Sequence, residues 1–338
     1  MKNKKHILII NTGGTISSIK TPNGYQPQSG IVAKTLASMS SLSHPDMPTY
    51  DLIEYTPLID SSNITLEDWN KISADIANHY NDYHGFVILH GTDTLAYSAS
   101  ALSFSLENLA KPVIVTGSQI PLSELRSDGR DNIITALYLA QTDFLFEVCV
   151  YFDQRLLRGN RAQKVSAYEF SAFDSPNFPP LAKVGIETNW QHSLLLPKPI
   201  KKFKRQLLKQ HKIANFRLFP GFSTQVLQHL FNEPIRGLVL ESYGSGNAQD
   251  NDPLFIEIIQ QATNNGILIL NCSQCHHGMV NMDTYATGHK LKQAGVLSGL
   301  NMTAEAAHCK MLYLLSKYKS TSTIKKKLSL SIRGETNK

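Results

Sequence analysis

Two short segments of the chain combine threonine hydroxyls with glycine directly after apolar runs. The first is Asn11-Thr-Gly-Gly-Thr-Ile-Ser-Ser18, which follows HILII, and the second is HGTDT over 90–94, which closes the run FVILH. Glycine allows the backbone to approach a ligand closely. The first segment therefore has three interpretations, namely a phosphate cradle, a site for a nucleophile, or only a tight turn.

The glycine spacing disfavours phosphate binding, because TGGT matches neither G-x-x-x-x-G-K-[ST] nor G-x-G-x-x-G. A threonine hydroxyl becomes a nucleophile when a neighbour takes its proton, and a lysine can serve where its pKa is lowered. Taken singly, Thr92 or Asp93 is most simply a helix N-cap, and Thr15 a turn hydroxyl. The occurrence of both segments at strand ends favours nucleophilic catalysis.

Strand-like and helix-like segments alternate around these residues and must position them. Apolar runs predict strands at 6–10, 50–55, 86–90, 112–117 and 146–152. Predicted helices begin near Ile31, at a capping box over Thr65–Asp68 that opens a helix through about Tyr80, directly after HGTDT, and near Asn132. This order predicts an α/β fold with an open, doubly wound, mostly parallel sheet.

Open parallel sheets bind ligands at the carboxyl ends of their strands. NTGGT follows the first predicted strand, TPLIDSSN follows the second, and HGTDT follows the third. We therefore expect three polar loops to converge on one edge of the sheet.

The second half of the chain repeats the alternation on a smaller scale. Strands are predicted at 216–221, 237–244 and 266–271, each followed by a helical segment. We expect an N-terminal α/β domain over 1–190 that carries most catalytic residues, a basic linker over 191–212, and a smaller α/β domain over 213–338.

Composition narrows the class of protein. The chain is 42% hydrophobic and 18% charged, and no apolar run approaches the roughly 18–20 residues of a membrane span. The N-terminus has lysines and a short apolar run but no small-residue cleavage site. We expect a cytoplasmic protein that does not bind membranes.

The net charge of +6 could point to an anionic partner. The excess of positive charge is local. Residues 188–232 contain no acidic residue and include Lys201, Lys202, Lys204 and Arg205. Interleaved aromatic residues, which would stack on bases, are lacking there apart from Phe203. We favour a solvated linker and expect no nucleic-acid partner.

The segment CSQCHH over 272–277 contains C-x-x-C-H, a pattern typical of haem attachment and of half of a zinc or redox site. Haem attachment requires export, and a zinc site requires a second ligand pair that the sequence lacks. We interpret the segment as a structural turn and expect no metal and no cofactor.

TGGTI and HGTDT together resemble the two signature motifs of bacterial-type L-asparaginases. The similarity covers almost the whole chain and is strongest to the type I, cytoplasmic branch. It includes the segments GYQPQSG, EYTPLIDSSN, GFVILHGTDTLAYSASALSF, KPVIVTGSQIPLSELRSDG, RGNRAQK, SPNFPPL, SYGSGNA and YATG.

The resemblance implies roles for five catalytic residues. Thr15 matches the nucleophilic threonine, and Tyr25 matches the tyrosine of a mobile loop that closes over the substrate and assists it. Thr92 matches the second catalytic threonine. Asp93 matches the residue that holds the substrate's α-amino group, and Lys164 matches the lysine hydrogen-bonded to Thr92.

The resemblance also implies which substrate is bound and which residues hold it. Asp60, Ser61 and Ser62 match the loop that holds the α-amino and α-carboxylate groups, and Asn247 matches a residue that reaches a neighbouring subunit's site. The implied reaction is hydrolysis of L-asparagine to L-aspartate and ammonia through a β-aspartyl ester. A homodimer or homotetramer is implied as well.

The chain departs from the type I pattern where enteric enzymes carry an allosteric asparagine site. Glu241 stands where the family has arginine, and Gln163 where it has threonine, whereas Cys275 matches the family's cysteine. A glutamate repels the carboxylate that an arginine would bind. We therefore predict an effector site whose binding is altered or lost.

Two other functions stay open at this stage. One is the asparaginase-like subunit of a tRNA-dependent amidotransferase, which needs an added domain before TGGT, where this sequence has eleven residues. The other is a non-catalytic protein that binds nucleic acid through the basic linker. Activity that survives neutralisation of the linker lysines would argue against the second.

Overall fold

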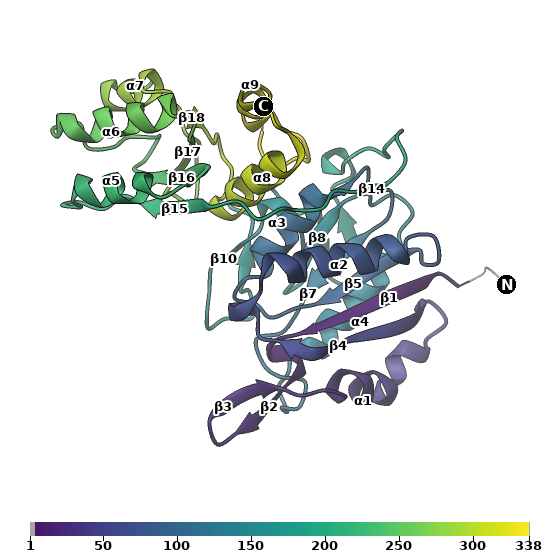
Figure 1. Cartoon of the computed structure of the whole chain (residues 1–338). Coiled ribbons are helices and arrows are strands. Elements are labelled where there is room, and N and C mark those ends of the chain that lie inside the picture. Colours follow the sequence, from purple (N-terminus) through teal and green to yellow (C-terminus); the bar gives the residue numbers. More distant parts are fainter. Residues whose placement is uncertain (1–3, 338) are drawn as a thin grey trace. The chain divides into compact units, whose positions relative to one another are not determined.

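The computed structural model describes residues 4–337. It divides the chain into two compact units, Met1–Gln206 and Leu207–Lys338 (Figure 1). Part of the range predicted as a linker is structured, because β14 (Lys204–Arg205) pairs antiparallel with β6 (Leu106–Glu107) of the first unit. In the region described, no helix combines the length and apolarity needed to cross a bilayer.

The first unit is built on a sheet with the strand order β13-β12-β9-β8-β7-β5-β1-β4. Its parallel strands are β4 (Thr49–Ile59), β1 (His6–Gly13), β5 (Gly85–Leu89), β7 (Val113–Thr116) and β8 (Val148–Phe152). The antiparallel strands are β9 (Arg155–Arg158), β12 (Ala182–Val184) and β13 (Thr188–Trp190). The prediction of a mostly parallel sheet is confirmed.

The antiparallel edge was not predicted, and its first turn explains why. Asp153 and Gln154 join β8 to β9 with φ of 45° and 62°. Turns of this kind usually contain Asn-Gly or Asp-Gly. This chain uses Asp-Gln, so the usual sequence signal is missing.

Helices cover both faces of this sheet. Ile7 and Ile9 pack in one core with α1 (Ile31–Ser38) and α4 (Gly129–Ala140). Leu8 and Ile10 pack in the other core with α2 (Leu66–Asn78) and α3 (Leu95–Ser105). Because successive strand residues point to opposite faces, the fully apolar run of β1 serves both layers. The doubly wound prediction is confirmed, as is the Thr65–Asp68 capping box that begins α2.

Short elements follow the first motif and were not predicted. The turn Thr15–Ser17 leads into a hairpin of β2 (Ser18–Thr21) and β3 (Gly24–Pro27). A second two-stranded pair, β10 (Gln163–Lys164) and β11 (Phe173–Asp174), carries the lysine of RAQK.

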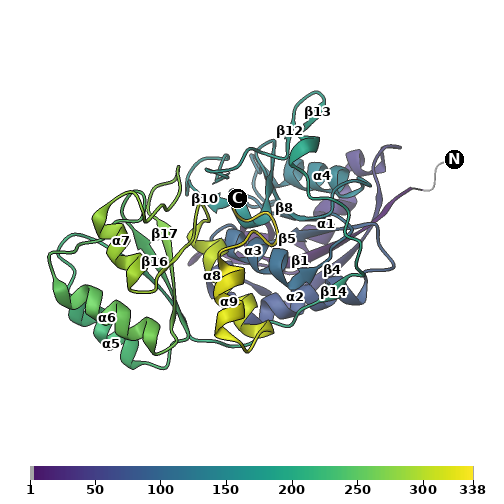
Figure 2. The ribbon, with the colours of Figure 1, turned by 90° about the horizontal axis from the view of Figure 1, so that it is seen from above.

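The second unit contains a parallel sheet in the order β15-β16-β17-β18. Its strands are β15 (Ile213–Arg217), β16 (Gly237–Ser242), β17 (Leu268–Ser273) and β18 (Leu297–Ser298). Figure 2 shows α5 (Thr224–Asn232), α6 (Pro253–Asn264) and α7 (Ala286–Gln293) on one side and α8 (Ala304–Lys317) on the other. The strand predicted at 216–221 instead ends at Arg217, because a turn with Gly221 at φ 81° follows.

A buried ion pair fastens the chain that follows α9 (Thr321–Leu328) to the second unit. Lys310 Nζ lies 2.7 Å from Glu335 Oε1, and both side chains are fully buried. Lys310 also donates to the carbonyl oxygens of Leu328 and Leu330. The ammonium is thus surrounded by acceptors, which is the condition for burying a charge.

Candidate active site

Three loops that carry predicted site residues leave the sheet side by side. Asn11 of β1 pairs with Leu89 of β5 and with Glu54 of β4, and Gly13 pairs with Ile59. The loops that follow these strands therefore begin at one edge. The predicted convergence of the three polar loops is confirmed.

The glycines of the two motifs let these loops touch through their backbones. Gly14 has φ of 83°, and a Cβ built on it would lie 2.2 Å from the Cα of Gly91. A Cβ on Gly91 would lie 2.4 Å from Ser61 Oγ. The Gly14 N–H donates to the carbonyl of Ile59 at 2.9 Å. The glycines thus serve loop-to-loop packing.

Lys164 joins the two residues at the start of α3. Its Nζ donates to Thr92 Oγ1 at 2.9 Å and to Asp93 Oδ1 at 2.7 Å. Its side chain is 19% exposed, whereas that of Asp93 is 64% exposed. The structure therefore brings together the predicted Thr–Lys–Asp group, with an ammonium at the hydroxyl of Thr92.

The interpretation of Thr92 or Asp93 as the N-cap of this helix is wrong. The N-cap residue is Thr94, and its side chain makes no capping bond. Thr94 Oγ1 instead donates to the carbonyl of Ser61 at 2.7 Å. The cap side chain thus connects two of the site loops, and Thr92 and Asp93 remain free to contact Lys164.

Thr15 lies half-buried at the start of the turn after Gly14. The residues around it are fixed, since Ser17 Oγ donates to Asn11 Oδ1 at 2.9 Å and Ser18 Oγ to the carbonyl of Gly14 at 3.0 Å. Within residues 4–337, no hydrogen bond engages the Thr15 hydroxyl. Hydrogen bonds thus hold the turn that carries the Thr15 hydroxyl, and the described part of the chain leaves that hydroxyl open to a substrate.

Tyr25 lies on β3 and is 52% exposed. Its hydroxyl donates to Glu124 Oε1 at 3.3 Å, and among the described residues it has no hydrogen bond to Thr15. Desolvation and the Glu124 carboxylate raise the pKa of Tyr25. Sequence reasoning missed Glu124, although its loop follows β7 at the same edge of the sheet.

The carboxylate of Glu54 holds the base of the hairpin that carries Tyr25. It accepts hydrogen bonds from Ser29 Oγ, from the Gly30 N–H at 2.8 Å and from Asn11 Nδ2 at 3.0 Å. Burial alone would raise the pKa of Glu54, but these three donors outweigh it and the pKa is lowered. Glu54 is a second residue that the sequence analysis did not single out.

The predicted substrate loop forms a short 3-10 helix over Ser61–Asn63. Asp60 caps it, because its Oδ1 accepts from the Ser62 N–H at 3.0 Å. Ser61 is buried against Gly91, and Ser62 is exposed. The loop thus packs on the second motif through Ser61.

The remaining predicted residues are distributed over both units. Gln163 lies on β10 of the first unit, and Asn247, Glu241 and Cys275 lie in the second. Asn247 Oδ1 accepts from Thr287 Oγ1 at 3.0 Å. Glu241 Oε2 lies 3.6 Å from Arg217 Nη1, so a cation already faces this carboxylate.

The C-x-x-C-H segment begins inside β17, whose last two residues are Cys272 and Ser273. None of the four cysteines, which all lie among the described residues, forms a disulfide, and burial raises the pKa of Cys272 to about 12. No group of three or more His, Cys, Asp or Glu side chains in residues 4–337 is arranged to hold a metal ion.

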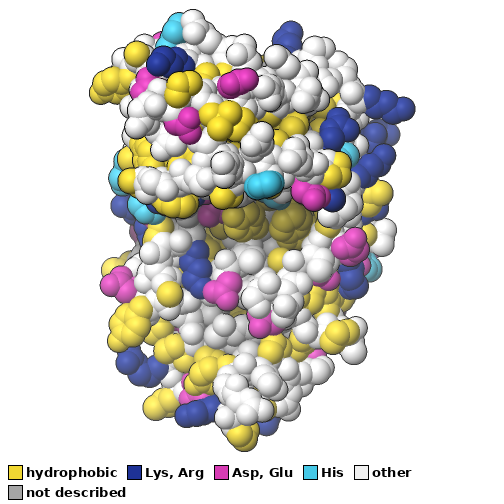
Figure 3. All heavy atoms as spheres, turned by 60° about the vertical axis from the view of Figure 1, so that its left-hand side comes forward, with side chains coloured by type: hydrophobic (Ala, Val, Ile, Leu, Met, Phe, Trp, Pro, Cys, Tyr) yellow, Lys and Arg dark blue, Asp and Glu magenta, His cyan; other side chains and the backbone are white. Residues whose placement is uncertain are grey.

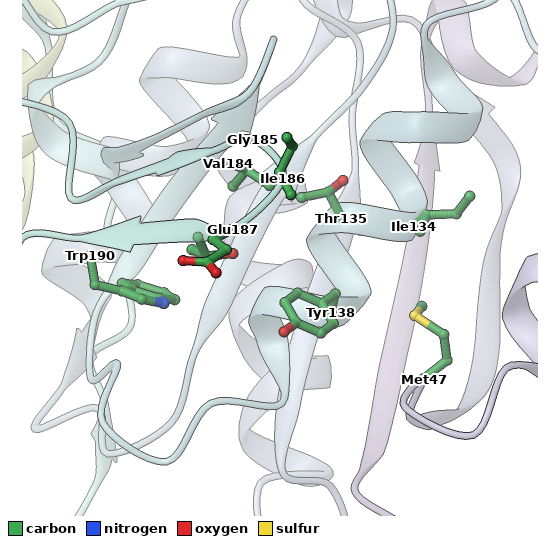
Figure 4. A pocket seen from close by; sticks show the side chains of 10 residues that line it. Met47, Ile134, Thr135, Tyr138, Val184, Gly185, Ile186, Glu187 and Trp190 are labelled. Atoms are coloured by element: carbon green, nitrogen blue, oxygen red, sulfur yellow. The ribbon is translucent and has the colours of Figure 1, made fainter.

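A separate pocket of about 470 Å³ lies between α4 and the β12–β13 hairpin (Figure 4). Ile134 and Tyr138 line it from the helix, and Ile186 and Trp190 from the hairpin. None of the predicted site residues lines this pocket. Elsewhere, the face drawn in Figure 3 mixes acidic, basic, polar and apolar side chains.

Comparison with known proteins gives consistent matches over both halves. The family model "Asparaginase, N-terminal" matches residues 6–195, and "Glutaminase/Asparaginase C-terminal domain" matches 212–328. The chain is 48% identical to L-asparaginase 1 of Escherichia coli (strain K12) over 332 residues, 98% of each chain.

Two solved structures agree over nearly the full length. The crystal structure of L-asparaginase I from Vibrio cholerae has a TM-score of 0.91 and 44% identity and covers 99% of both chains. The thermostable L-asparaginase from Thermococcus kodakarensis has a TM-score of 0.89 and 30% identity, covering 98% of this chain and 99% of that one.

Proposed function

This chain belongs to the asparaginase family, and we propose that it hydrolyses the side-chain amide of L-asparagine to L-aspartate and ammonia. The observation that carries the proposal is the contact of Lys164 with both Thr92 and Asp93 at the sheet edge where the two motifs touch. The substrate is a small zwitterion, and carboxylates at this edge suit its ammonium group. Asp60 and Asp93 supply these carboxylates.

We assign the nucleophile to Thr15, because no hydrogen bond from residues 4–337 engages its hydroxyl, while Lys164 donates to that of Thr92. Thr15 Oγ bonds to the amide carbon, the carbon–nitrogen bond breaks, and the hydroxyl proton leaves with ammonia. Tyr25, on its hairpin, assists this transfer. Water then adds to the β-aspartyl ester near Thr92 and Lys164, and its proton returns to Thr15 as L-aspartate departs.

The assembly, location and effector response form part of the same proposal. We propose a homodimer or homotetramer in which Asn247 reaches a neighbouring subunit's site. We place the enzyme in the cytoplasm, and four cysteines without a disulfide suit a reducing compartment. We further propose that the position of Glu241, whose carboxylate pairs with Arg217, does not bind an effector carboxylate.

The test is ammonia release from purified protein over a wide range of L-asparagine concentrations, with Thr15→Ala as the inactive control. A hyperbolic curve supports both the hydrolase and the loss of effector control. A sigmoidal curve that becomes hyperbolic in Glu241→Ala would keep the enzyme and overturn the effector proposal. No ammonia at any concentration would overturn the proposed function.

A further inference from the structure

A chain of buried hydrogen bonds lies beneath the second motif. His90 is 1% exposed, and its Nδ1 lies 2.7 Å from the carbonyl oxygen of Gly91. Its Nε2 lies 2.8 Å from Ser98 Oγ on α3. Trp69 Nε1 on α2 donates to the same Ser98 Oγ at 2.9 Å. The proposed reaction uses none of these three side chains.

The direction of each bond follows from what each group can donate. The indole N–H is only a donor, so Ser98 Oγ accepts from Trp69. A carbonyl oxygen is only an acceptor, so His90 Nδ1 must carry a hydrogen toward Gly91. Burial lowers the pKa of His90 to about 4, so the ring is neutral at pH 7. Its Nε2 is then bare, and the Ser98 hydroxyl donates to it.

This arrangement fixes a peptide group of the site. The Gly91–Thr92 peptide is trans, since the cis bond in the described chain is Thr56–Pro57. In a trans peptide the C=O and the N–H point in opposite directions. A ring that holds the Gly91 carbonyl therefore turns the Thr92 N–H away from itself, and among residues 4–337 that N–H has no acceptor.

We propose that His90 is a positioning residue that, as the neutral Nδ1–H tautomer set by Ser98 and Trp69, aims the Thr92 N–H at the reacting carbonyl oxygen. The proposal rests on the proposed amide hydrolysis. An amide donor aimed in advance stabilises the charge that develops on that oxygen. Because the charge on that oxygen is largest in the transition state, a misaligned Thr92 N–H lowers kcat more than it raises KM.

Two variants of His90 separate the two ring nitrogens. The amide of an asparagine side chain can take the place of Nδ1 and donate to Gly91, whereas that of glutamine reaches the place of Nε2. We expect His90→Gln to lower kcat on the order of 10- to 100-fold with KM within about 3-fold, and His90→Asn to stay within about 10-fold. Equal or greater kcat in His90→Gln would overturn the proposal.

A second pair of variants leaves the ring intact. Ser98→Ala removes the hydroxyl that sets the tautomer, and we expect kcat to fall several-fold at unchanged KM. Ser103→Ala is the control, because Ser103 lies on the same helix and its hydroxyl, among the described residues, donates only to the carbonyl of Ala99, at 2.7 Å. Unchanged kcat in Ser98→Ala would overturn the proposal.

Spectroscopy on the unmodified protein provides a test that does not depend on activity. In protein labelled with nitrogen-15 histidine, the His90 signals are those missing from a His90 variant, and we expect a protonated Nδ1 and a bare Nε2 at pH 7. A protonated Nε2 would overturn the proposal. This readout stands even if the protein releases no ammonia, so it separates failure of the tautomer from failure of the proposed function.

Discussion

Replacement of Lys164 by methionine tests the central contact of the site. The change keeps an unbranched apolar chain out to Cε and removes the ammonium that lies 2.9 Å from Thr92 Oγ1 and 2.7 Å from Asp93 Oδ1. Lys164 is 19% exposed, so the methionine side chain replaces mostly buried atoms. We expect loss of turnover with little loss of stability.

The size of the effect follows from the two contacts. A hydrogen bond to a charged group is worth about 1.5–3 kcal/mol where it is sheltered, as at Thr92, which is 5% exposed. The pair with Asp93 is worth about 0–1 kcal/mol, because that carboxylate is 64% exposed and screened by water. A sum of about 1.5–4 kcal/mol corresponds to roughly a 13- to 900-fold fall in kcat.

The assay is ammonia release at saturating L-asparagine, together with thermal unfolding of each variant. Lys183→Met is the matched control, because Lys183 is exposed on β12. The double variant with Thr92→Val should lose no more than the worse single variant, because the two residues act as one unit. A Lys164→Met enzyme within about 3-fold of the parent would refute the reasoning.

Three further changes test the scaffold. Gly14→Ala should lower the free energy of unfolding by about 2–5 kcal/mol and abolish activity, whereas Gly24→Ala, with open space around its Cβ, should cost at most about 2 kcal/mol in the same calorimetric experiment. Lys310→Met should cost about 3–5 kcal/mol in denaturant unfolding, against about 0–1 kcal/mol for Lys292→Met at an exposed pair. The lowered pKa of Glu54 means that its contribution is complete above the ordinary value of 4.5 and is lost as pH falls through the folded-state pKa, so Glu54→Gln should flatten the stability profile below pH 4.5. If the stability of Glu54→Gln fell with pH in parallel with that of the parent protein, the lowered pKa of Glu54 would be contradicted.

The central strands could be predicted because burial on both faces leaves a strong signal. The runs at 6–10 and 86–90 are apolar at successive positions, as strands covered by helices must be. The capping box at Thr65 could also be predicted, since its two reciprocal hydrogen bonds join residues that are three positions apart in the sequence. Features set by local chemistry were thus recovered from the sequence.

Features that depend on distant partners could not be recovered in this way. The hairpin over 18–27 contains Lys20 and Tyr25 on exposed strands, so it lacks an alternating apolar pattern. Glu54 appears in the sequence as one more polar strand residue, and only the fold brings it to Ser29 and Gly30. The site residue Lys164 was located by family resemblance, because a lone lysine carries no local signal.

The two motifs are parts of one structure, and their spacing in the chain is secondary to strand register. β1 pairs with β5 so that Asn11 lies opposite Leu89, and this register places Gly14 against Gly91. A side chain at either glycine would force the loops apart, and both Thr15 and Thr92 would move with them. The pair TGGT and HGTDT is therefore a stronger indicator of function than either motif alone, because each motif supplies the surface on which the other is positioned.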